Sequence, residues 1–242
     1  MSTQSTIRRL GRAQDGITMI ELLVTIIVTG IVTAMLVAGW INLQRSSSFA
    51  LASNNARGDG RDALSRISSE LRNCQPTAFP TASPSPTAQP NLFVTAQPTD
   101  VTFYSAYNDT TEAADQRGTG VRLTRMWLST KNNPNDTTTA TSSSTRQYLY
   151  WRRDTNGNGS LDSGDLTRLM ARFVVNNTFS IAVFRYGHLT SSGVEWNSAV
   201  TGADIKLITA VQARIIIDSN PQRPPVPVDL TTTVRLRNAT TY

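Results

Sequence analysis

The feature that most constrains this chain is an uncharged run from Leu22 to Ile41. A helix rises about 1.5 Å per residue, so a run of this length spans the ~30 Å of hydrocarbon in a bilayer. The run is too long for a secretory signal peptide. The polar segment before it carries Arg8, Arg9 and Arg12. This positive flank predicts a single-pass helix in the cytoplasmic membrane, with the N-terminus in the cytoplasm and the bulk of the chain outside.

One carboxylate, Glu21, stands at the start of the run. A charge inside lipid costs a few kcal/mol or more, so it usually has a partner. An amino group on the same or a neighbouring chain would serve. The surrounding segment G-ITMIE-LLVTIIVTGIV resembles the prepilin cleavage and methylation motif of type IV pilins and pseudopilins.

The resemblance implies that a prepilin peptidase cuts between Gly16 and Ile17 and methylates the new terminus. Glu21 is then the fifth mature residue, and it pairs with the terminal amine of a neighbouring subunit. Ile17 and Glu21 share a helix face because they are four residues apart, and Glu21 would set the register during assembly. The chain has Ile17 where the family prefers Phe, and Met19 where many members have Leu. The alternative is an ordinary anchor with a stray Glu.

Beyond the membrane the helix is expected to continue to about Asn73, with a filament-core half at 17–41 and an amphipathic half at 42–75. The apolar stripe of the second half has helical spacing. Ala56 and Gly60 extend the stripe backwards. The stripe consists of Leu64, Ile67 and Leu71. Arg57, Arg61 and Glu70 are expected to lie off it. Alternatively, Gly58 and Gly60 divide the segment into two helices.

Residues 76–242 are expected to form an extracytoplasmic β-rich domain that begins with a Pro/Ser/Thr-rich crossing. Strand-like runs with hairpin-type connections follow, and they predict a mainly antiparallel sheet. The runs are LFVT, VTFYSAY, VRLTRMWLS, QYLYWRR, TRLMARFVV, FSIAVFRY, IKLITAVQARIIID and VDLTTTVRLRN. The fold class is therefore α+β and pilin-like, with the long helix packed on the sheet. The last run also resembles the closing strand of larger minor pilins and pseudopilins of the PilW and GspJ type.

A segment between two of these runs, DTNGNGSLDSGD, matches the spacing of a calcium loop. Leu161, the apolar residue of this segment, would pack the loop against the rest of the domain. The last ligand is Asp rather than Glu, which predicts a Kd of about 10⁻⁴ M or weaker and a structural role for Ca²⁺. A metal-free Asn/Gly/Asp turn is the alternative. The expected ligands are Asp154, Asn156, Asn158, Ser160 through its carbonyl, Asp162 and Asp165.

Composition limits the other functions. The chain has one Cys, Cys74, which excludes an intrachain disulfide, and one His, His188, which we expect in a loop. Neither a catalytic triad, nor a histidine zinc site, nor a phosphate loop is visible, so we expect no enzyme and no small-molecule substrate. Trp127, Trp151 and Trp196 are expected in the sheet or its core rather than in a ligand groove.

The resemblance therefore implies a minor pilin or pseudopilin, with other pilins, the peptidase and the membrane as partners, and with a final place in a surface or periplasmic filament. The net charge of +6 permits a second reading, a DNA-binding pilin of a DNA-uptake system. A type II secretion pseudopilin is a third.

Overall fold

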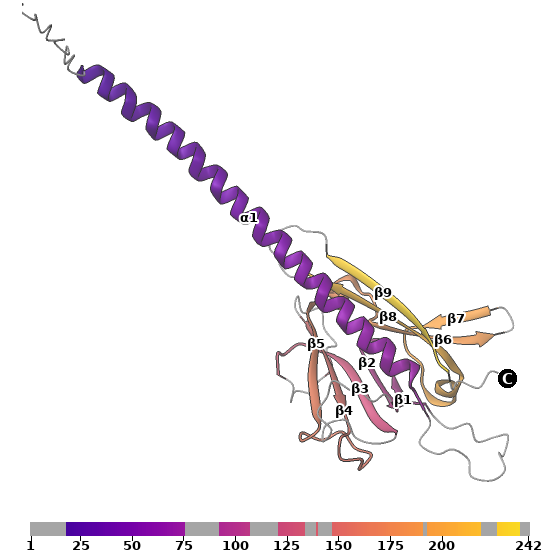
Figure 1. Ribbon diagram of the computed structural model, residues 1–242. Helices are drawn as coiled ribbons and strands as arrows, with labels where there is room; N and C mark the ends of the chain where they lie inside the picture. The colour runs from indigo at the N-terminus through magenta and orange to yellow at the C-terminus, as the bar shows by residue number, and fades with distance from the viewer. Residues whose placement is uncertain are drawn as a thin grey trace, which may run out of the picture. The chain divides into compact units, whose positions relative to one another are not determined.

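The computed structural model describes residues 18–75, 92–106, 121–133, 139, 147–190, 193–218 and 227–237 (Figure 1). The chain divides into two compact units, Met1–Phe49 and Ala50–Tyr242. One helix, α1 (Met19–Arg72), runs from the first unit into the second without interruption. The expected single long helix is thus confirmed, and the glycines at 58 and 60 do not divide it.

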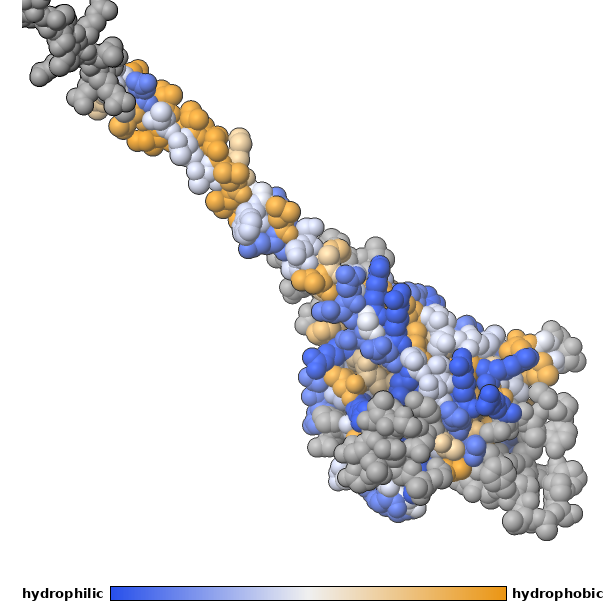
Figure 2. All heavy atoms as spheres, viewed as in Figure 1, coloured by the Kyte–Doolittle hydropathy of each residue, from blue (hydrophilic) through white to orange (hydrophobic). Residues whose placement is uncertain are grey.

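In the first unit, α1 exposes apolar side chains along its length, as the hydrophobic colouring in Figure 2 shows. Met35 and Leu36, neighbours that point in different directions, are each 69% exposed, and Trp40 is 64% exposed. This helix is the one described helix that is long and apolar enough to cross a membrane. A surface with so much exposed apolar area is stable only in lipid or against other apolar helices.

The second unit holds a nine-stranded sheet in which all the described strand pairs are antiparallel. The order is β1-β2-β3-β4-β5-β8-β6-β7, and β9 pairs with β8. Two short 3-10 helices, η1 (Asn176–Phe179) and η2 (Gly202–Leu207), lie in the connections. The strands are β1 (Phe93–Ala96), β2 (Asp100–Ser105), β3 (Arg122–Ser129), β4 (Gln147–Arg153), β5 (Leu166–Val174), β6 (Phe184–Thr190), β7 (Gly193–Asn197), β8 (Ile208–Ile217) and β9 (Val228–Arg235). The mainly antiparallel α+β fold is confirmed.

The second half of α1 packs its small and apolar face on this sheet. Ile67 and Leu71 are fully buried, as the helical spacing predicted. Gly60 lies where β8 and β9 come close, because a Cβ there would stand 2.5 Å from a methyl of Leu230 and 3.1 Å from one of Ile217. Gly58, by contrast, has open space around it. The glycine at 60 therefore lets the helix approach the sheet.

Glu70 was expected off the apolar stripe, and that expectation is wrong. Its side chain is fully buried, and Ser105 Oγ of β2 donates to its Oε2 at 2.8 Å. Arg66, one turn earlier, places Nε 3.4 Å from Glu70 Oε1 and its guanidinium over the Trp151 ring. These contacts explain the burial, since a buried carboxylate is tolerated when it is paired and hydrogen-bonded.

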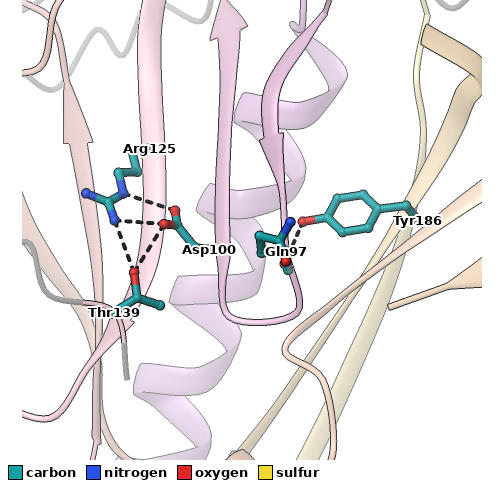
Figure 3. A network of polar contacts seen from close by, with 5 residues as sticks. All are labelled: Gln97, Asp100, Arg125, Thr139 and Tyr186. Atoms are coloured by element: carbon teal, nitrogen blue, oxygen red, sulfur yellow. Dashed lines mark hydrogen bonds and ion pairs between the residues drawn. The ribbon is translucent and has the colours of Figure 1, made fainter. Parts of the chain in front are cut away.

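The sheet curls until the β1–β2 turn reaches β6. Val200, just after β7, bridges to Ala96 at the end of β1. The Tyr186 hydroxyl of β6 donates to the Gln97 carbonyl at 2.8 Å, as Figure 3 shows. On the other side of the same turn, Asp100 accepts two hydrogen bonds from Arg125, at 3.0 and 2.7 Å. The turn between β1 and β2 is therefore fixed from two sides.

The structure also tests four other expectations. His188 lies in β6 rather than in a loop, with Nε2 3.5 Å from Glu195 Oε2 of β7. The run FSIAVFRY becomes a strand only at Phe184. Its first residue, Phe179, ends η1, and Ser180 after it has a left-handed backbone with φ of 55°. Strand β7 was not foreseen. Cys74 is buried and has no disulfide. Trp127 and Trp151 are core residues, while Trp196 is half-buried.

Candidate functional site

The N-terminus of α1 is organised around Glu21. Thr18 precedes the helix, its carbonyl accepts from the Glu21 and Leu22 N–H groups, and its hydroxyl accepts from Glu21 N–H at 3.3 Å. Thr18 and Glu21 thus have the S/T-x-x-E spacing of a capping box. The Glu21 side chain is exposed, and within the described part of the chain its carboxylate has no ion-pair partner. A carboxylate in the first turn also interacts favourably with the helix dipole.

Polar side chains in the apolar half of α1 bond to their own helix. Thr25 donates to the Leu22 carbonyl at 2.8 Å, and Thr33 donates to the Thr29 carbonyl at 2.7 Å. A hydroxyl satisfied in this way enters hydrocarbon at a lower cost. Glu21 is consequently the residue of this half that most needs a partner from outside the helix.

The segment from Asp154 to Asp165 connects β4 to β5, so it caps a β-hairpin as expected. Asp154 and Asp165, its first and last residues, are buried, whereas Asn156, Asn158 and Asp162 are exposed. Two glycines carry the sharp turns, with φ of 76° at Gly157 and 78° at Gly159. Their positions fit the backbone that glycine adopts most readily.

The carboxylates of this loop face backbone N–H groups. Asp154 accepts from Gly157 at 2.6 Å and from Gly159 at 2.9 Å. At the other end, Asp165 accepts from Thr155 at 3.0 Å and from Asp162 at 2.6 Å. Both ends of the loop are thereby tied to its interior, which relieves the cost of burying two carboxylates.

The exposed middle of the loop is tied by amides. The Asn156 side-chain oxygen accepts from Asn158 N–H at 2.9 Å, and that of Asn158 accepts from Ser160 N–H at 2.8 Å. The Asn158 side-chain nitrogen donates to Asp162 at 2.7 Å. In the described residues no group of three or more His, Cys, Asp or Glu side chains is placed to hold a metal ion. A metal here would therefore depend on amide and carbonyl oxygens as well as carboxylates.

Comparison with known proteins identifies a motif at the N-terminal end of α1. A family profile described as the prokaryotic N-terminal methylation motif matches residues 11–37. The match covers Arg12 of the basic flank, the expected cleavage position, Glu21 and most of the apolar run. The match supports a subunit of the type IV pilin or pseudopilin class. No curated protein matches it.

For a type IV pilin or pseudopilin, the motif implies processing by prepilin peptidase and assembly with other pilins. Gly16 and Ile17, the expected cleavage pair, lie outside the described residues. The N-terminal site belongs to the first unit and the 154–165 loop to the second.

Sequence reasoning missed two polar residues of this pilin. Thr18 was overlooked as a helix cap, although Thr18 and Glu21 in the sequence TMIE have the spacing of a capping box. Asn176 was not singled out by the sequence, yet it is fully buried between strands. No local pattern predicts that second role, because its partners lie about 40 positions later in the chain.

Proposed function

We propose that this chain is a minor subunit of a type IV pilus or pseudopilus. In this proposal, cleavage after Gly16 creates a new N-terminus at Ile17, and the apolar half of α1 holds the mature chain in the membrane until it joins a filament. The observation that carries the proposal is that Glu21, exposed in the first turn, begins a helix half whose apolar side chains are also exposed.

In this proposal Glu21 finds its ion-pair partner on a neighbouring subunit. A terminal ammonium on an adjacent subunit neutralises the carboxylate in a low-dielectric setting, and the gain depends on correct axial register. A minor rather than a major role is favoured by the large second unit, which carries a nine-stranded sheet. A DNA-uptake pilin or a secretion pseudopilin would use the same helix.

Mass spectrometry of the mature N-terminus tests the processing step. The full chain, expressed with a prepilin peptidase, should begin at N-methyl-Ile17. A chain that still begins at Met1 in a host with active peptidase would contradict the proposal. Glu21→Ala tests assembly: it should be processed normally but be depleted from sheared filament fractions. Thr18→Ala is the matched control, since it removes a cap but keeps the carboxylate.

We further propose that the 154–165 loop binds Ca²⁺ with a structural role. The ligands would be side-chain oxygens of Asp154, Asn156, Asn158, Asp162 and Asp165 and the Ser160 carbonyl. The spacing, the left-handed turns at the two glycines and the convergence of N–H groups on Asp154 support this proposal.

Thermal unfolding of the full chain in detergent tests the calcium proposal. Chelation should lower the melting temperature and millimolar Ca²⁺ should restore it, with Mg²⁺ less effective because it prefers octahedral geometry. Asp162→Ala should abolish the calcium response. Ser163→Ala, an exposed substitution in the same loop, should keep it. An identical melting temperature with and without Ca²⁺ would remove the claim.

A further inference from the structure

A groove of about 1150 Å³ lies in the second unit. Its walls come from the β1–β2 turn, the connection from η1 to β6, and the faces of β6, β7 and β8. About half of the lining residues carry amide or hydroxyl side chains, including Gln97, Asn177, Ser198 and Gln212. Such a surface suits a ligand rich in hydroxyl groups, because amides both donate and accept hydrogen bonds.

Trp196 provides an aromatic surface in this groove. Its indole lies over Gly187 of the neighbouring strand, where a Cβ would stand 3.2 Å from the ring. The missing side chain at Gly187 therefore leaves the room that the indole occupies. Trp196 is half-buried and lines the groove. A half-buried indole that lines a groove is a rigid platform for a partly apolar ring.

Arg185 provides the charge. It lies beside Trp196, whose carbonyl accepts from Arg185 Nη2 at 3.3 Å, and its side chain is exposed. Among the described residues Arg185 has no carboxylate partner. The other cations are compensated: Arg214 pairs with Asp229 at 3.0 Å, and Arg125 pairs with Asp100. The groove thus offers one guanidinium for one anionic group.

The groove is also held in shape before any ligand enters. Its β1–β2 rim is fixed by the Tyr186–Gln97 and Arg125–Asp100 contacts of Figure 3. A preformed wall lowers the ordering cost of binding.

We propose that this groove binds a saccharide that carries a carboxylate, with one sugar ring stacked on Trp196 and its carboxylate on Arg185. A nucleic acid fits less well, because its binding rests on several phosphate contacts and the described lining of the groove has a single uncompensated guanidinium. The proposal is independent of filament assembly, since none of these residues belongs to α1.

The experiment uses the full chain in detergent on an array of uronic and sialic acid oligosaccharides, their neutral counterparts and oligothymidylate. Acidic glycans should be retained over neutral ones. Arg185→Glu and Trp196→Ala should each weaken retention about tenfold or more. Arg235→Ala, an exposed arginine on β9 outside the groove, should match the wild-type chain, as should Glu21→Ala.

Melting curves show whether each variant is folded, and Arg185→Glu keeps the test decisive should Trp196→Ala unfold. Retention of no glycan, retention unchanged by Arg185→Glu, or tighter binding to oligothymidylate would each overturn the proposal. Loss of filament entry by Glu21→Ala with unchanged glycan retention separates this proposal from that of assembly.

Discussion

The Asn176 carboxamide oxygen accepts a hydrogen bond from the backbone N–H of Ile216 at 2.7 Å. The same side chain donates to the Arg214 carbonyl at 2.7 Å. Along this edge of β8, β6 pairs as far as Ala213 and β5 pairs only at Ile217. Asn176 therefore occupies the gap between two strands and satisfies the backbone where no strand does.

Replacing Asn176 with Ala should destabilise the sheet by about 2–5 kcal/mol, because a buried donor and a buried acceptor lose their partners. Urea unfolding of the full chain in detergent, followed by tryptophan fluorescence, measures this. Thr178→Ala, an exposed change in the same short helix, should cost less than about 0.5 kcal/mol. Equal effects would show that the amide has no special role.

The two glycines in the second half of α1 should respond oppositely to substitution. Gly58→Ala should raise the free energy of unfolding by up to about 1 kcal/mol, since alanine is the better helix former and the position is open. Gly60→Leu should lower it by about 1–3 kcal/mol, because Leu230 and Ile217 leave no space. A stabilised Gly60→Leu variant would refute the close helix–sheet approach.

Alkaline pH should destabilise the second unit. Burial, aided by the charge of Glu70, raises the pKa of the Cys74 thiol. Burial, aided by Asp100, raises the pKa of the Tyr186 phenol. The folded state therefore keeps these protons longer than the unfolded state does. Their contribution is complete below the unfolded pKa values, about 8.5 for Cys and 10 for Tyr, and falls as pH rises through them.

The measurement is the free energy of unfolding from pH 7 to 11. The decline should begin near pH 8.5 and steepen near pH 10. Cys74→Ala should remove the first part of the slope, and Tyr186→Phe the second. A flat profile in the wild-type chain would contradict both assignments.

The two loop glycines offer a further comparison. Both have left-handed backbones, which cost a non-glycine residue about 1–2 kcal/mol. At Gly157 a Cβ would also meet the Arg122 guanidinium, whereas Gly159 is open. Gly157→Ala should therefore be more destabilising than Gly159→Ala, and the excess should shrink in an Arg122→Ala background. Equal costs in both backgrounds would exclude the contact with Arg122.

Sequence patterns predicted the parts of this pilin that depend on local periodicity. The apolar run predicted the first half of α1, and the i, i+3, i+7 spacing predicted its second half and the buried face at Leu64, Ile67 and Leu71. Glu70 escaped this reasoning because its burial depends on Ser105, 35 residues away. Period-2 runs located most strands, but η1 displaced the start of β6 because neighbouring apolar residues do not specify a turn.

The candidate sites also differ in whether their residues are close or distant in the sequence. Glu21 and the ends of the 154–165 loop were found because their signals are spacings within a dozen residues. The groove was not foreseen, and Trp196 was assigned to the sheet, because its walls come from segments far apart in the chain. Only the curl of the sheet brings those walls together.

The Ala96–Val200 bridge also bears on how the chain reaches its final form. Polypeptides are made from the N-terminus, so the first hairpin exists long before the residues that cover its edge. Until the residues around Val200 have been synthesised, this end of β1 presents an unpaired strand edge, which is a template for mispairing. Contacts so distant in sequence slow folding, and the chain would therefore benefit from a chaperone that holds it until its C-terminal part is made.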